Sequence, residues 1–267
     1  CYRMALQTRE QHIKREKATS NICTAQALLA TMAGMYAVWH GPEGIRDIAL
    51  RIHRTAAYLA GMLEHWGYRP LHDAYFDTLH FALPGRVSQE ALRKIALEHQ
   101  VNLLYLPDGT VSLSIDETTD YQALDKLMTL FGQAVGSYRT PARTLPEACR
   151  IPEALRRTTP YLTHEVFHLY HTETEMMRYI KRLDRKDISL AHSMISLGSC
   201  TMKLNAAAEM PPLSLAGFSG IHPLVPGDQA QGYKELIHNP GEELKAINGF
   251  AGLRFPPTPG AAGGITR

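Results

Sequence analysis

The sequence predicts an α/β fold, and two observations carry this prediction. Apolar residues recur at helical spacing from Ile45 to Leu63, and again in residues 88–100 and 120–134. Residues 75–83, 101–107 and 110–116 are instead short apolar or alternating runs beside turn residues, which is typical of strands. Together these segments indicate a small α/β subdomain over roughly residues 45–136.

Two helices are expected at the start of the chain. Residues 21–39 are rich in Ala, Leu and Met and nearly apolar on all sides, which predicts a buried helix with Asn21 at its N-cap. The text HGPEG at residues 40–44 ends this helix. Pro42 then suits the first turn of a second helix, which runs up to Gly67.

The rest of the chain is less regular. Residues 137–163 collect Pro, Arg and Thr without periodicity, which predicts a linker with one short helix at PEALRR. Residues 171–187 predict a helix whose inward side chains are Met176, Met177, Ile180 and Leu183. The stretch beyond it has many Gly and Pro residues, so we expect the second part not to close a core alone. The predicted domains are residues 1–136, the linker 137–163 and residues 164–267.

Composition excludes several classes of function. The formal net charge of +2 is too small to favour nucleic acid or an anionic membrane as the main partner, and the basic run TREQHIKREK is interpreted as a solvated helix face. Four widely spaced cysteines form no zinc-binding pattern and indicate a reducing compartment. No apolar run approaches the roughly 20 residues that span a bilayer.

The run SLGSCTMKLN, residues 196–205, has no helical or strand period and is expected to be a loop that serves a ligand. Ser199, Thr201 and Asn205 can donate to a carboxylate or phosphate, and Lys203 supplies charge. Cys200 could be a nucleophile in an electropositive setting. A polar loop around an inert, buried cysteine is an equally good interpretation of the spacing.

Two further motifs could bind a ligand, a phosphate in one case and a metal ion in the other, but each is a less specific signal. The Gly-rich text PTPGAAGG at residues 257–264 could cradle a phosphate with its backbone N–H groups, although such text is more often only a turn. The text HEVFH places His164, Glu165 and His168 at zincin spacing, with His171 further along. The motif follows the segment TTPYLT, which is expected to be extended and not helical, so we interpret the match as chance. A zinc hydrolase is the alternative, which a metal assay would test.

Three segments resemble the glycine cleavage system P-protein family, glycine dehydrogenase (decarboxylating). They are RMALQTREQHIKREKATSNICTAQALLATMAGMYAVWHGPEG, FHLYHTETEMMRYIKRLDRKDISLAHSMISLGSCTMKLNAAAEMPP and IHPLVPGDQAQGYKELI, and GSCTMKLN is highly specific to this family. The similarity covers nearly the whole chain. Family members typically carry THPVF where this chain has THEVF, so the resemblance makes the zincin match incidental.

The resemblance implies an enzyme that depends on pyridoxal phosphate and has two homologous halves of the aspartate aminotransferase fold, fold type I. The chain would cover the end of the first half, the linker and the start of the second, cofactor-carrying half. The family decarboxylates glycine and passes the aminomethyl group to the lipoyl arm of the H-protein. The resemblance also implies other glycine cleavage proteins as partners, a homodimer or heterotetramer, and a bacterial cytoplasm or mitochondrial matrix.

The same resemblance assigns the site residues. It places Ser199, Cys200, Thr201, Lys203 and Asn205 at the cleft, where the hydroxyl and amide groups suit the substrate carboxylate or the lipoyl end. Cys23 lies in a family-like segment and faces the same cleft or is a redox-sensitive thiol. Backbone donors at Gly260, Ala261 and Gly263 would remain for the cofactor phosphate.

Two departures from the family limit what the chain is expected to do by itself. The family reads close to QPNSGAQGE where this chain has PPTPGAAGG, and the family's Schiff-base lysine follows a histidine, whereas no His-Lys pair occurs here. We therefore expect an internal portion of a P-protein that is inactive and poorly soluble alone. The alternative is a non-catalytic scaffold or split subunit that pairs with a lysine-bearing partner.

Overall fold

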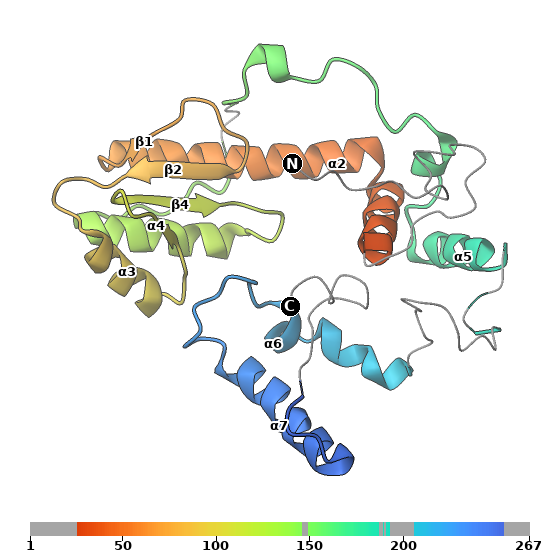
Figure 1. Cartoon of the computed structure of the whole chain (residues 1–267). Coiled ribbons are helices and arrows are strands. Elements are labelled where there is room, and N and C mark those ends of the chain that lie inside the picture. Colours follow the sequence, from red (N-terminus) through yellow and green to blue (C-terminus); the bar gives the residue numbers. More distant parts are fainter. Residues whose placement is uncertain (1–25, 146–148, 187–188, 190, 193–205, 254–267) are drawn as a thin grey trace, which may run out of the picture. The chain divides into compact units, whose positions relative to one another are not determined.

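The computed structural model describes residues 26–145, 149–186, 189, 191–192 and 206–253, shown in Figure 1. Two compact units divide the chain. One consists of residues 40–169, and the other combines residues 1–39 with residues 170–267. The two units are described separately below.

The helix α2 (Gln26–His65) is broken at Gly41, where φ is 62° and ψ is −178°. This conformation is available almost only to glycine, because a side chain at positive φ meets the backbone. Pro42 follows directly and has no N–H to continue the helical hydrogen bonds. The prediction of two helices separated by HGPEG is therefore confirmed from residue 26 onward, whereas its predicted cap, Asn21, lies outside the described residues.

A four-stranded antiparallel sheet forms the middle of residues 40–169. Its strands are β1 (Arg69–Pro70), β2 (Thr78–Ala82), β3 (Leu104–Tyr105) and β4 (Thr110–Ser114), in the order β1-β2-β4-β3. The three predicted strands correspond to β2, β3 and β4, whereas β1 was not predicted. Phe81 pairs with Val111 and His80 with Ser112, so apolar and polar pairs alternate between the two faces.

Two further helices complete this unit, and each begins after a residue whose side chain caps it. Ser88 accepts a hydrogen bond from Ala91 N at the start of α3 (Gln89–Glu98). Asp120 does the same for Ala123 N at the start of α4 (Tyr121–Val135), which ends at Gly136 with a left-handed φ of 71°. In Figure 1, α2 and α4 lie alongside the sheet. The α/β subdomain predicted for residues 45–136 is confirmed.

The core of this unit lies between the helices and the apolar face of the sheet. The rings of Tyr68, Phe81 and Phe131 contact one another edge to face, with centroids 5.4–5.7 Å apart. The buried Tyr68 hydroxyl donates to Phe131 O at 2.9 Å, and burial raises the pKa of this phenol. The other large buried side chains here include Leu59, Leu63, Leu79, Leu92, Val111, Ile115, Leu124, Met128 and Leu130.

The second unit contains the first part of α2, then α5 (Glu173–Asp184), α6 (Ala216–Ser219), α7 (Gln231–Asn248) and two short 3₁₀ helices (Ala207–Glu209 and Pro211–Ser214). Val38 and Met176 are the buried apolar side chains among its described residues. The prediction of a buried first helix is wrong for Leu29 and Met32, which are exposed. The inward prediction is confirmed for Met176 but wrong for Met177 and Ile180, which are 63% and 48% exposed.

Two more elements bear on the predictions. A 3₁₀ turn at Glu153–Leu155 confirms the short helix expected at PEALRR. The helix α7 was not predicted, because Pro240 and Gly241 lie inside it, and a Pro-Gly pair is typical of a turn. Among the described residues, no helix combines the length and apolarity that crossing a bilayer requires.

Candidate functional site

The polar face of the sheet in residues 40–169 carries a hydrogen-bonded cluster of polar side chains. Thr78 and His80 on β2 lie opposite Ser114 and Ser112 on β4. Since alternate strand residues point to the same face, these four side chains share the face that the core does not use. The Thr78 and Ser114 hydroxyls are 2.8 Å apart and hydrogen-bonded.

His80 belongs to a chain of hydrogen bonds that ends at a carboxylate. Its Nε2 lies 2.7 Å from the Thr110 hydroxyl oxygen, and that hydroxyl donates to Asp108 Oδ1 at 2.5 Å. Because the hydroxyl has only one hydrogen, His80 must donate through Nε2. Hydrogen bonds from the Thr110 hydroxyl and backbone N–H hold the pKa of Asp108 below its usual range. The cluster fixes the orientation of the His80 ring.

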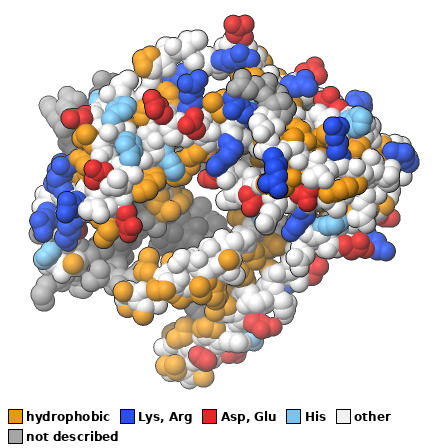
Figure 2. Space-filling model, turned by 180° about the vertical axis from the view of Figure 1, so that it is seen from behind, with side chains coloured by type: hydrophobic (Ala, Val, Ile, Leu, Met, Phe, Trp, Pro, Cys, Tyr) orange, Lys and Arg blue, Asp and Glu red, His pale blue; other side chains and the backbone are white. Residues whose placement is uncertain are grey.

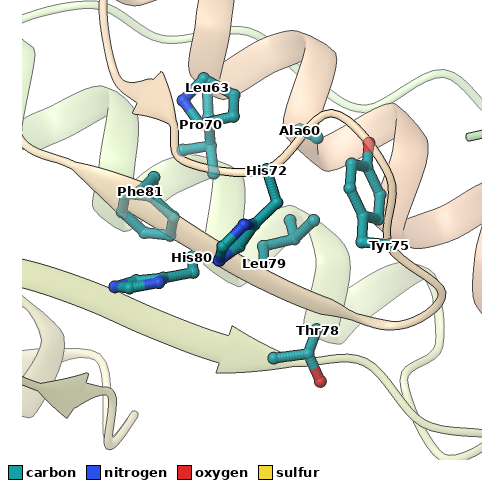
Figure 3. A pocket seen from close by; sticks show the side chains of 9 residues that line it. All are labelled: Ala60, Leu63, Pro70, His72, Tyr75, Thr78, Leu79, His80 and Phe81. Atoms are coloured by element: carbon teal, nitrogen blue, oxygen red, sulfur yellow. The ribbon is translucent and has the colours of Figure 1, made fainter.

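A narrow pocket adjoins this cluster, and Figure 3 shows its lining side chains. The His72 and His80 rings lie beside each other, with centroids 5.6 Å apart, while Leu63, Leu79 and Phe81 supply apolar walls. Burial raises the pKa of the Tyr75 phenol, and the positive charge of Arg150 partly opposes this. The space that a water-sized molecule can reach is about 10 Å³, which is too little for an organic substrate.

A wider hollow of about 380 Å³ lies next to it and shares His72, Tyr75, Thr78 and His80. This volume falls in the usual range for small-molecule sites. Its remaining lining residues are Ala74, Phe76, Asp77, Leu104, Leu106 and Ser112. Neither pocket is lined by Lys or Arg. The polar groups that line them are imidazole, hydroxyl and carboxylate groups, which can form hydrogen bonds with a ligand.

The zincin-like segment HEVFH, residues 164–168, does not have the geometry of a metal site in the structure. Glu165–His168 is a single 3₁₀ turn that follows His164, not the α-helix that would align the ligands. His168 Nε2 bonds Leu162 O at 3.1 Å, and His171 Nδ1 bonds Trp39 O at 2.7 Å. Among the residues that the structure describes, no group of three or more His, Cys, Asp or Glu side chains could hold a metal ion. The zinc hydrolase alternative therefore loses its geometric basis.

None of the predicted site residues lies in the described part of the chain. Ser199, Cys200, Thr201, Lys203 and Asn205 fall in residues 193–205, Cys23 falls in residues 1–25, and Gly260, Ala261 and Gly263 fall in residues 254–267. Their roles remain predictions. The cluster around His80 was not predicted, although the alternation in TLHFA and the DGT turn text were signals that could have indicated it.

Comparison with known proteins gives consistent matches. Residues 1–131 match the family model described as glycine cleavage system P-protein. The chain is 65% identical over 263 residues to a glycine dehydrogenase (decarboxylating) from Bacteroides fragilis, covering 98% of this chain and 28% of the relative. It is 48% identical over 264 residues to the human protein named glycine dehydrogenase (decarboxylating), mitochondrial, covering 98% of this chain and 26% of that protein.

A solved structure also matches. It is the inhibitor-bound crystal structure of the glycine decarboxylase (P-protein) of the glycine cleavage system, with 32% sequence identity over 49% of this chain and 31% of the other. The TM-score of 0.38 is too low to support a particular fold. The chain thus spans little more than a quarter of the length of the curated relatives that it matches.

Proposed function

Because the chain is related in sequence to the glycine cleavage system P-proteins, we propose that it forms part of a glycine dehydrogenase (decarboxylating). The observation that carries this proposal is the 65% identity over 263 residues to the Bacteroides fragilis enzyme. Identity at this level over 98% of the chain supports a shared role for the aligned stretch. The aligned stretch includes both the α/β subdomain and the GSCTMKLN motif.

The proposed reaction is the decarboxylation of glycine, with transfer of the aminomethyl group to the lipoyl arm of the H-protein. The other glycine cleavage proteins and a dimeric or heterotetrameric assembly belong to the same proposal. One relative is bacterial and the human relative is named mitochondrial, which supports a bacterial cytoplasm or a mitochondrial matrix as the proposed compartment. The two halves of fold type I, with a linker at residues 137–163, are proposed as the architecture.

The two pockets on residues 40–169 do not fit pyridoxal phosphate. A phosphate needs backbone N–H groups or cationic side chains around it, whereas both pockets on residues 40–169 are lined by neutral and acidic groups and by histidines. The sequence also has no His-Lys pair of the kind that holds the family's cofactor. We therefore assign to residues 40–169 a structural role, and we derive no catalytic step from them.

The proposed contribution to the cleft comes from residues 196–205. Ser199, Thr201 and Asn205 offer hydroxyl and amide donors that suit a carboxylate, and Lys203 offers a positive charge. Their function would be to bind and orient glycine or the lipoyl end. Cys200 and Cys23 are proposed to face the same cleft, and backbone N–H groups at Gly260, Ala261 and Gly263 to face the cofactor phosphate.

A chimeric enzyme tests this proposal. The stretch of the Bacteroides fragilis protein that aligns with this chain is replaced by the chain, and release of CO₂ from carboxyl-labelled glycine is measured with lipoylated H-protein. We expect a rate within about tenfold of the unaltered enzyme, because most contacts of the aligned stretch are retained. A soluble, cofactor-loaded chimera that releases no CO₂ would contradict the proposal.

Matched asparagine variants then test the motif. Asn205→Ala in the chimera should raise the KM for glycine or lower kcat, because it removes a donor proposed for the cleft. Asn248→Ala is the control, since Asn248 is exposed and its amide bonds Leu244 O within the same helix, α7. Equal activity of both variants would remove Asn205 from the proposed site.

A further inference from the structure

The segment that follows α4 is attached to α2 at three points. We call residues 137–145 and 149–163 the strap. Tyr58 Oη accepts from Ala142 N at 2.9 Å, His53 Nε2 lies 2.9 Å from Arg150 N, and the Tyr161 hydroxyl donates to Pro42 O. As the strap advances in sequence, its partners on α2 go back from residue 58 to residue 42, so it runs antiparallel to the helix (Figure 1).

His53 is the most constrained of these three attachments. Its side chain is 2% exposed, and Nδ1 lies 2.8 Å from Phe76 O while Nε2 faces Arg150 N. A carbonyl oxygen can only accept and a backbone N–H can only donate. Both contacts are therefore satisfied by one form of the ring, the neutral tautomer with its hydrogen on Nδ1. The Phe76 ring, parallel to the imidazole at 6.0 Å, fixes the plane of the ring.

Other groups hold the same segment against the unit. The Tyr121 hydroxyl on α4 donates to Pro141 O at 3.1 Å, and the Arg143 guanidinium lies over the Tyr121 ring. Leu145 packs against the hydrophobic core. The Arg150 guanidinium and Glu64 are 3.7 Å apart, an exposed pair that contributes little by itself.

We propose that His53 and Tyr58 lock the strap along α2, so that its residues are held as part of the unit of residues 40–169 instead of forming the irregular linker that the sequence predicts. The lock consists of two backbone N–H groups, those of Ala142 and Arg150, each bound by one aromatic side chain of α2. The Tyr161 contact with Pro42 adds a third attachment, next to the break at Gly41. This inference does not depend on the proposed catalytic function.

Amide hydrogen exchange on the full 267-residue chain, resolved to single residues, tests the lock. In the unchanged chain, the Ala142 and Arg150 amides should exchange at least about tenfold more slowly than free peptide amides, the factor expected for one retained hydrogen bond. His53→Phe keeps an aromatic ring and should accelerate exchange at Arg150 about tenfold. Tyr58→Phe removes only a hydroxyl and should do the same at Ala142.

His99→Phe is the matched control, because the His99 ring bonds the Gln133 side chain and not a strap amide. It should leave both strap amides unchanged. The lock is overturned if the Ala142 and Arg150 amides of the unchanged chain exchange at free-peptide rates. It is equally overturned if folded His53→Phe leaves Arg150 protected. Should His53→Phe fail to fold, the Ala142 amide in Tyr58→Phe decides the question, since unchanged protection there contradicts the lock.

Discussion

Residues 40–169 and residues 206–253 use apolar side chains in opposite ways. In the first region the apolar faces of three helices and a sheet meet and exclude water, and Leu59 and Phe131 are 0% exposed. In the second region α7 places Leu236, Ile237, Leu244 and Ile247 at helical spacing, yet all four are exposed, and Figure 2 shows apolar side chains on the surface. An amphipathic helix specifies its own apolar face, but only a second element closes a core.

The largest expected contrast comes from shortening one aliphatic side chain in each region. Leu59→Ala should lower the free energy of unfolding by about 2–5 kcal/mol, because it leaves a cavity in a closed core. Ile247→Ala should change it by less than about 0.5 kcal/mol, because Ile247 is 77% exposed. Urea unfolding followed by fluorescence of the buried Trp66 measures both. Equal effects would mean that residues 206–253 share the closed core.

A pair of glycine substitutions gives the next largest effect. A Cβ at Gly132 would lie 2.3 Å from Ser137 O, which is backbone and cannot turn away, whereas a Cβ at Gly232 meets nothing within 4 Å. We expect Gly132→Ala to cost about 1–3 kcal/mol. Gly232→Ala should leave the main thermal transition unchanged and slightly raise the helicity of α7. Circular dichroism during heating tests both, and a Gly132→Ala protein as stable as the unchanged one would refute the close contact.

A shift to acidic pH should produce the smallest difference in stability between the two regions. The Thr118 hydroxyl and N–H donate to Asp116 and hold the pKa of this carboxyl below its usual range. The ionised form is thus favoured in the folded state, so its contribution is present above about pH 4 and lost as the pH falls through the lower folded pKa. Water screens this exposed group, and we expect less than about 1 kcal/mol.

A half-buried carboxyl in the second unit provides the control for that measurement. Hydrogen bonding by Lys181 lowers the pKa of Asp184 in the same direction, but Asp184 lies on α5, outside the closed core. Asp116→Asn should therefore flatten the acid dependence of the thermal midpoint between about pH 5 and 2, whereas Asp184→Asn should not. The reverse result would mean that the second unit, and not residues 40–169, determines the thermal midpoint.

The contrast also explains which predictions succeeded. Helices with clear caps, such as α3 after Ser88 and α4 after Asp120, were predicted because hydrogen bonding within a few residues determines where they start. The helix α7 was missed, since Pro240 locally disfavours a helix. Exposure of Met177 was not foreseen, because a periodic pattern shows which face is apolar and not whether another element covers it.

The candidate site shows a similar division. The resemblance predicted chemistry for residues 196–205, which lie outside the described residues, whereas the cluster that the structure does describe was not predicted. Asp108, Thr110 and His80 come together because antiparallel pairing of β2 with β4 brings residue 80 close to residue 110. Register between strands depends on the core-facing residues of both, so the motif was not visible in either segment alone.

The shortness of β1 and β3 has a consequence for aggregation. Both edge strands are two residues long, at Arg69–Pro70 and Leu104–Tyr105, and Pro70 has no N–H to offer. A sheet that ends in such edges presents too few free backbone groups to recruit a strand from another molecule. Aggregates of the isolated chain should therefore form through apolar side chains and show no cross-β order, such as binding of thioflavin T.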